Sequence, residues 1–271
     1  MTNIDGVDIH IEGSGPETIV LIHGWPDTYR LWDGTVAALK DRYRCVRFTL
    51  PGFDRAHPRH VRTLEQLAGF VRQVVDAVSP SQPVTLLVHD WGCMIGYQFY
   101  GRHPERVARI VGVDVGDMRS LGREAGARTR TFILAYQLVL AMAWLMPAAL
   151  GDPLTRRFAR ALGFREDIEP VGGHMNYLYY NVWFGGPESL RRQALAFNPA
   201  CPTLYIYGRR KPAMLHAQAW LDQLRARPGN AVVEFDTGHW VMTRAPERFH
   251  QVVRDWLAQP AQSPGGAVAS G

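Results

Sequence analysis

Short apolar runs alternate with longer amphipathic stretches along most of the chain, and this alternation predicts a parallel sheet flanked by helices. Runs of strand length without polar interruption, typical of strands buried on both faces, lie at residues 18–22, 83–88, 109–113 and 203–207. Residues 63–78 place apolar side chains three and four positions apart, which predicts an amphipathic helix. We therefore expect a doubly wound, mostly parallel α/β sheet with its site at the carboxyl ends of the strands.

The ends of the chain supply further elements. Residues 7–12 and 18–22 are predicted to pair as a hairpin across the turn at 13–16, which contains two glycines and a proline. Additional expected elements are a short helix at 31–39 and strands at 44–49 and 232–235.

One long stretch interrupts the alternation and defines the predicted domains. Residues 118–200 are mainly helical in pattern, and the sheet resumes at 203–207. We expect a core made of residues 1–117 and 201–258, with residues 118–200 inserted as a helical cap. Residues 259–271 are rich in Pro, Gly, Ala and Ser, and are predicted to be a disordered tail.

The segment 132–150 is apolar over nearly the length that crosses a bilayer. It contains Gln137 and Pro147, and it connects two strands of one predicted sheet, which a membrane-spanning helix could not do. A buried cap helix is the favoured interpretation, and the alternative is an interfacial helix that takes apolar substrate from a membrane. Stable membrane insertion is not expected.

Composition sets the broad class. The chain has 271 residues, 46% of them hydrophobic, which suffices for one large core. The formal charge of +5 comes almost entirely from arginines scattered along the chain, so nucleic-acid binding is not expected. Cys45, Cys93 and Cys201 are widely spaced, no secretory signal opens the chain, and we expect a cytoplasmic protein. No metal site, phosphate loop or cofactor is predicted.

The most informative motif is the turn after residues 83–88. Asp90 lies between this strand and a helical pattern that begins near Cys93, where a hydrolase commonly carries its nucleophile. Gly92 and Gly96 provide the small neighbours that such a strained turn requires, although Val88 departs from the usual glycine two residues before the nucleophile. An aspartate here would form an ester with carbon, which excludes ordinary serine-type ester cleavage.

Two further strand ends fit the same architecture. Residues 18–22 run into His23-Gly24-Trp25-Pro26-Asp27, where an α/β-hydrolase supplies a backbone N–H group for a developing oxyanion. Residues 232–235 lead to His239, which could act as the base. The order of nucleophile and then histidine is that of an α/β-hydrolase.

On these residues the chain resembles the Asp-nucleophile α/β-hydrolases, which include epoxide hydrolases, haloalkane dehalogenases and haloacetate dehalogenases. The resemblance covers about residues 15–257 and implies the α/β-hydrolase fold with an inserted cap. In many relatives the acid that orients the histidine follows the strand at 203–207, but here that loop reads Gly208-Arg209-Arg210-Lys211. The resemblance to members with the acid one strand earlier assigns Asp114, with Asp117 in reserve or as a helix N-cap.

The resemblance also implies roles around the nucleophile. Backbone N–H groups of Trp25 and Trp91 would hold the non-attacking carboxylate oxygen, and the Trp91 indole could face a halide. Tyr136 and Tyr180 would be the cap tyrosines that protonate an epoxide oxygen, with Tyr179 close behind Tyr180. Other expected pocket-wall residues are Asp27, Trp32, Tyr179 and Trp240.

The His-Gly-Trp-Pro sequence resembles epoxide hydrolases more than haloalkane dehalogenases, and the arginine that haloacetate dehalogenases carry after the nucleophile is replaced by Trp91 and Met94. Opening of an epoxide to a diol is therefore the leading hypothesis, on a small hydrophobic substrate and by a monomer or homodimer. Dehalogenation is the main alternative. A ligand-binding protein with little turnover, and an esterase or lactonase that uses Asp90 as a base for water, also stay open.

Overall fold

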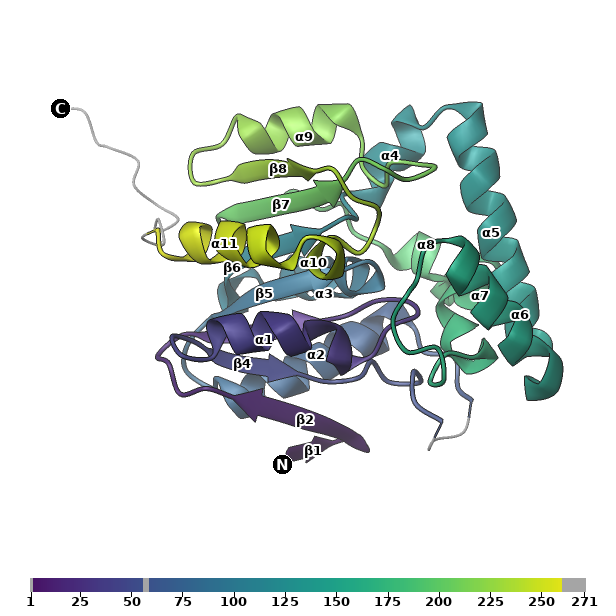
Figure 1. The fold of residues 1–271 in the computed structure, drawn as a ribbon, viewed down its shortest axis with the longest axis horizontal. Coiled ribbons are helices and arrows are strands. Elements are labelled where there is room, and N and C mark those ends of the chain that lie inside the picture. Colours follow the sequence, from purple (N-terminus) through teal and green to yellow (C-terminus); the bar gives the residue numbers. More distant parts are fainter. Residues whose placement is uncertain (1, 56–58, 260–271) are drawn as a thin grey trace.

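An eight-stranded sheet forms the centre of the computed structural model, which describes residues 2–55 and 59–259 (Figure 1). The strand order is β1-β2-β4-β3-β5-β6-β7-β8, antiparallel from β1 through β4 and parallel from β4 through β8. The strands are β1 (Thr2–Ile4), β2 (Val7–Glu12), β3 (Thr18–Ile22), β4 (Arg44–Arg47), β5 (Val84–His89), β6 (Val107–Val113), β7 (Thr203–Gly208) and β8 (Ala231–Phe235). Apart from Gln259, the predicted tail lies outside the described residues.

Helices cover both faces of the sheet. In Figure 1, α1 (Asp33–Leu39) and α11 (Pro246–Leu257) lie in front of it, and α2 (Leu64–Val78) and α3 (Trp91–Arg102) lie behind. α9 (Gln218–Arg225) packs beside β8, and the short α10 (Val241–Arg244) precedes α11. The doubly wound, mostly parallel α/β sheet predicted from the apolar runs is therefore confirmed.

The predicted hairpin of residues 7–12 and 18–22 is wrong. β2 pairs with β1 and β4, whereas β3 pairs with β4 and β5, so β4 separates the two segments. The hairpin that does form joins β1 to β2 through Asp5 and Gly6, both at positive φ. Asp-Gly is the strongest short-range hairpin signal, and it outweighs the looser Gly-rich turn at 13–16.

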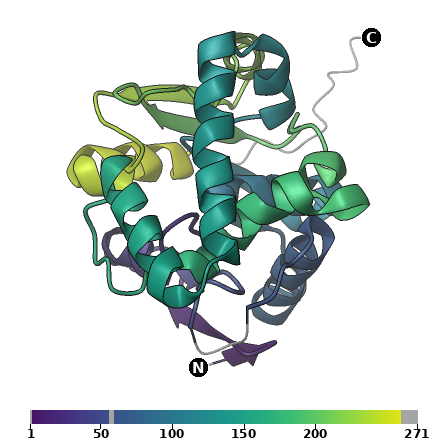
Figure 2. The same cartoon turned by 90° about the vertical axis from the view of Figure 1, so that its right-hand side faces the viewer.

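Five helices between β6 and β7 form a layer at the carboxyl ends of the strands (Figures 1 and 2). They are α4 (Met118–Glu124), α5 (Ala127–Leu145), α6 (Ala148–Ala161), α7 (Tyr177–Phe184) and α8 (Leu190–Gln193). Figure 2 views this layer face-on, with α5 running across it. We call it the cap layer.

The apolar segment 132–150 is not one buried helix. α5 ends at Leu145, and α6 begins after Pro147. Leu134, Met142 and Leu145 expose 40%, 57% and 64% of their surface, so much of α5 faces outward. Within the described part of the chain, no helix is both long and apolar enough to cross a bilayer.

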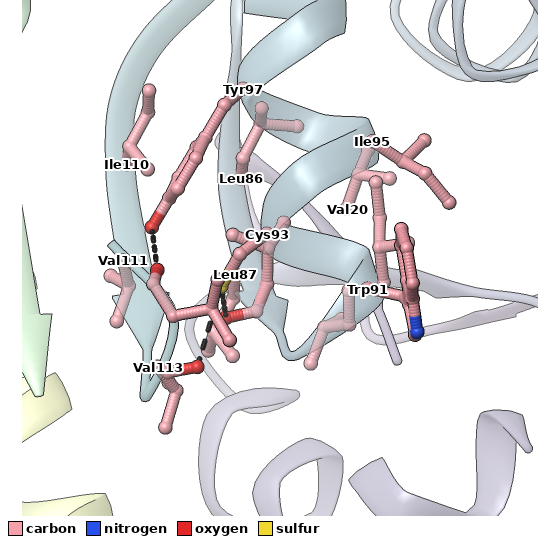
Figure 3. Packing of buried hydrophobic residues seen from close by; sticks show 14 of the residues in the cluster. Val20, Leu86, Leu87, Trp91, Cys93, Ile95, Tyr97, Ile110, Val111 and Val113 are labelled. Atoms are coloured by element: carbon pink, nitrogen blue, oxygen red, sulfur yellow. Dashed lines mark hydrogen bonds between the residues drawn. The ribbon is translucent and has the colours of Figure 1, made fainter. Parts of the chain in front are cut away.

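Beneath the cap layer, α3 packs on the central strands (Figure 3). Cys93 and Tyr97 point from α3 toward β6, and Tyr97 donates to the carbonyl of Val115 at 2.9 Å. The Cys93 thiol lies 3.3 Å from the carbonyls of Val88 and Val113. These contacts fix the first turn of α3, and with it the turn at Asp90.

Candidate active site

Asp90 occupies a sharp turn between β5 and α3. Its φ of 53° and ψ of −120° are unusual for a residue with a side chain, and such strain is held by its surroundings. Two glycines allow the close packing. A Cβ on Gly92 would lie 2.2 Å from the carbonyl oxygen of Ile22, and one on Gly24 would lie 2.4 Å from Asp90 Oδ1.

The sheet register brings the predicted catalytic side chains to one edge. His89 of β5 pairs with Val113 of β6, so Asp90 and Asp114 each follow a paired strand end. His239 follows β8 and points back to both carboxylates. Its Nε2 lies 3.4 Å from Asp90 Oδ2, and its Nδ1 is hydrogen bonded to Asp114 Oδ2.

Asp114 is completely buried and its φ is 70°. Besides His239, its carboxylate accepts the amide N–H of Gly208 at 2.9 Å and contacts Lys211 Nζ at 2.5 Å. Asp117, held in reserve as the acid, instead caps α4, because it accepts the N–H of Ser120 at 2.8 Å. It also accepts the N–H of Phe197 at 2.9 Å, which ties α4 to the segment before β7.

The ionised forms of Asp90, Asp114 and His239 stabilise one another. Burial would raise the pKa of Asp90, but the hydrogen bond and charge of His239 outweigh it and hold the pKa below its usual value. Burial would lower the pKa of His239, yet Asp114 and Asp90 raise it to about 9. Burial would also raise the pKa of Asp114, but the charges of Lys211 and His239 keep it low. At neutral pH Asp90 is thus an ionised carboxylate beside an imidazolium.

One oxygen of Asp90 is held and the other is free to react. Oδ1 accepts the backbone N–H of Trp25 at 2.7 Å. Trp91 is the first residue of α3, so its N–H group is one of the amides left without a partner inside the helix. Oδ2 faces His239. The arrangement can stabilise negative charge on Oδ1 while Oδ2 carries a bond to carbon.

Two cavities meet at Asp90. The larger, of about 510 Å³, extends beneath the cap layer between α3, α4, α5, α7 and α8. Its wall is mostly apolar, with Arg119, Arg123 and Arg191 at its exposed side. The smaller, of about 70 Å³, is lined by Trp25, Tyr179, Lys211, His239 and Trp240, among others. Asp90, Tyr136 and Leu215 line both.

Tyr136 and Tyr179 are the tyrosines that line the cavities beside Asp90. Their rings meet edge to face at 5.9 Å, and Tyr179 also contacts the rings of Trp25 and Trp91. Burial and then the charge of Asp90 raise the pKa of Tyr179, and the same two causes act on Tyr136. The Gln137 amide lies 3.4 Å from the Tyr136 oxygen as a donor, which leaves the phenolic proton available to another acceptor.

The prediction that Tyr180 is a proton donor beside Asp90 is wrong. It stacks on Phe184 with ring centroids 5.3 Å apart, and it lines neither cavity. Residues 179 and 180 are consecutive in α7, where each step turns the side chain by about 100°. Because Tyr179 faces Asp90, Tyr180 faces away from it.

Two of the expected pocket-wall residues are also placed differently. Trp32 is fully buried in the core and lines neither cavity. Asp27 lies behind the wall and accepts the indole N–H of Trp240 at 2.9 Å. Trp240 itself does line the smaller cavity. Burial raises the pKa of the Asp27 carboxyl to about 7, despite the hydrogen bond from Trp240.

Three residues that support the candidate site were not predicted from the sequence. Asn176 holds the indole of Trp25 at 2.8 Å, Gln137 bridges Tyr136 and Trp183, and Lys211 contacts Asp114. Of these, only Lys211 carried a signal, as a rare lysine in the loop where an acid is commonly found. Among the described residues, no group of three or more potential metal ligands is found.

Comparison with known proteins shows the fold family of the chain. Residues 17–246 match the family model described as alpha/beta hydrolase fold. The "Probable oxidoreductase EphD" of Mycobacterium tuberculosis is 36% identical over 173 residues, which are 57% of this chain and 29% of that protein. "Epoxide hydrolase 1" of Caenorhabditis elegans is 22% identical over 90% of this chain and 66% of its own length. The chain thus spans less than a third of the mycobacterial relative.

Among solved structures, an epoxide hydrolase from Bacillus megaterium in complex with an inhibitor superimposes with a TM-score of 0.71. The match covers 95% of this chain and 99% of that one, at 20% sequence identity. At this identity the likeness establishes the fold alone.

Proposed function

The chain belongs to the α/β-hydrolase fold family, and on that premise we propose that it is a hydrolase whose Asp90 opens an epoxide to give a diol. The proposal needs a carboxylate nucleophile, a base for water, donors for the oxyanion and a proton donor for the epoxide oxygen. Each is available at the meeting point of the two cavities. No cofactor is required.

The first step forms a covalent ester. Asp90 Oδ2 attacks one epoxide carbon, and the bond between that carbon and the ring oxygen breaks with its electron pair on oxygen. Tyr136 or Tyr179 gives its phenolic proton to this oxygen, so the product carries one free hydroxyl group. The raised pKa of Tyr179 keeps this phenol protonated before the step.

The second step releases the diol. Neutral His239 takes a proton from water as that water attacks the ester carbonyl carbon of Asp90, while the amides of Trp25 and Trp91 stabilise the oxyanion. The tetrahedral intermediate then collapses and expels the diol oxygen, which takes the proton from His239. The water oxygen replaces the carboxylate oxygen that leaves with the diol, and the carboxylic acid of Asp90 then passes its proton to His239, which restores the ionised pair.

The single observation that carries the epoxide assignment is the placement of Tyr136 and Tyr179 on the cavity wall beside Asp90. A phenol is an acid suited to an alkoxide leaving group, whereas a halide leaves without a proton. The Trp91 ring, whose indole would face a halide in a dehalogenase, contacts the Tyr179 ring edge to face at 5.3 Å. The indole N–H of Trp25 is donated to Asn176. Both contacts favour the epoxide assignment over dehalogenation. The similarity to relatives named epoxide hydrolases supports the epoxide assignment as well.

The size and lining of the larger cavity suit a small hydrophobic substrate. We expect the protein to act in the cytoplasm as a monomer or a homodimer, and size-exclusion chromatography with light scattering measures that oligomeric state.

The test is a panel of epoxides, haloalkanes and haloacetates of matched carbon skeleton, with diol and halide measured in parallel. We expect diol from epoxides and no halide above the level of an Asp90→Asn control. Halide release without diol would overturn the epoxide assignment in favour of dehalogenation. Tight binding without any product would favour a ligand-binding protein.

A further inference from the structure

Asp114, the expected acid partner of His239, contacts a second cation, Lys211. Asp114 is fully buried, with Oδ2 bonded to His239 and Oδ1 accepting from Gly208. Lys211 Nζ lies 2.5 Å from the same Oδ1, and the Lys211 side chain is only 6% exposed. The ammonium group therefore lies inside the site, on the side of Asp114 opposite to the imidazole, and its side chain also lines the smaller cavity.

This placement is specific to Lys211 within its loop. The neighbouring Arg209 and Arg210 turn outward and pair with Asp236 at the surface. Of the 30 Lys and Arg residues in the chain, only Lys40 and Lys211 are lysines. An ammonium group loses much hydration on burial, and a direct carboxylate partner is what offsets that loss. Asp114 is that partner.

The two steps make opposite demands on His239. Two carboxylates, Asp90 and Asp114, face the imidazole ring and favour its protonated form. That form suits the resting site, where it stabilises the ionised nucleophile. Hydrolysis of the ester needs neutral His239, however. Esterification removes the charge of Asp90, but it leaves the charge of Asp114 in place.

We propose that Lys211 is a positioning residue that offsets the charge of Asp114, so that His239 releases its proton once Asp90 has become an ester. The inference rests on the proposed function. The proton that His239 releases returns to the tyrosinate left by epoxide opening, which restores the phenol. His239 is then neutral and accepts the proton of the attacking water.

Other groups that face His239 must be separated from this effect. The His89 ring lies 4.5 Å from that of His239, but burial lowers the pKa of His89 to about 3, so it stays neutral. Asp27 lies behind Trp240, and its pKa of about 7 falls in the range to be measured. Each Lys211 variant is therefore compared in a background with Asp27→Asn as well.

The experiment replaces Lys211 with Met, which keeps most of the length of the side chain and removes its charge. Formation and hydrolysis of the ester are timed separately by rapid quench and intact mass. We expect ester formation within about threefold of wild type, because Asp90 is unchanged. In the pH-rate profile of ester hydrolysis, the acid limb should move to higher pH by about one unit, the lower end of the shift that a nearby charge produces. The ester should thus accumulate near neutral pH and clear at alkaline pH.

Lys211→Gln separates charge from position, since it can still donate to Asp114. It should shift the limb as Lys211→Met does, and it provides the same test if the Met variant does not fold. Lys211→Arg keeps the charge, and the exposed Lys40→Met removes a lysine elsewhere; both should retain the wild-type profile.

An unshifted limb in Lys211→Gln, with the ester still forming, would overturn the role of Lys211 and leave the proposed function intact. Absence of an ester in the wild type as well as in the variants would instead count against the proposed function.

Discussion

The sheet edge and the cap layer contribute to the same cavity in different ways. At the sheet edge, Asp90, Asp114 and His239 each follow a strand, and strand pairing fixes their spacing. In the cap layer, Tyr136 and Tyr179 come from helices whose rotation decides which side chains face inward. In the proposed mechanism, the covalent chemistry would therefore belong to the core, whereas proton donation and substrate fit would belong to the helices above it.

The largest expected effect comes from disturbing the sheet edge. Gly24→Ala places a Cβ 2.4 Å from Asp90 Oδ1 and 2.6 Å from the amide nitrogen of Trp91. Displacement of the nucleophile by about 1 Å is expected to lower kcat/KM by about 100-fold, and displacement of the Trp91 amide from the oxyanion adds a further loss of about 10² to 10³. Steady-state kinetics on the best epoxide measures the loss.

The matched control is Gly69→Ala in α2, because a Cβ there meets no atom within 4 Å. It should keep full activity. If Gly24→Ala were as active as Gly69→Ala, the sheet edge would tolerate an added methyl group that its packing is predicted to exclude.

A smaller effect is expected from the cap layer. Replacing both Tyr136 and Tyr179 with Phe removes the proposed donors while Asp90 and His239 stay in place. We expect ester formation from epoxides to slow by about 10² to 10⁴, the usual range for general acid catalysis. Each single variant should lose less than the pair.

Tyr180→Phe tests the helix rotation directly, since Tyr180 stacks on Phe184 outside both cavities. Activity within about twofold of wild type is expected. A loss as large as that of the double variant would mean that α7 presents its other face to Asp90.

The sequence predicts the residues of the sheet edge better than those of the cap layer, for a physical reason. The order of strands along the chain places the ends of β5, β6 and β8 at one edge of the sheet, so Asp90 and His239 could be proposed from their positions. Asp114 was added by the resemblance to relatives that carry the acid one strand earlier. In a helix, an error of one residue turns a side chain away, as happened with Tyr180. The prediction that Trp32 lines the pocket is also wrong, because a tryptophan near the site in sequence can lie either in the cavity wall or in the core.

Contacts between distant segments carried the weakest signal. The hydrogen bond that the Trp25 indole donates to Asn176 joins residues 151 positions apart, and neither local sequence predicts it. The pair of Lys211 and Asp114 spans 97 positions. Lys211 stands out in the sequence as a rare lysine, but the sequence does not predict its pairing with Asp114. That pairing depends on β6 and β7 lying next to each other in the sheet.

The most direct measurement for the central claim is the mass of His239→Gln after incubation with an epoxide substrate. Without the base, the ester should persist, and the protein should gain the full mass of the epoxide. Peptide mapping should place this mass on Asp90, and the double variant with Asp90→Asn should show none. Absence of an adduct, or an adduct on another residue, would contradict the account.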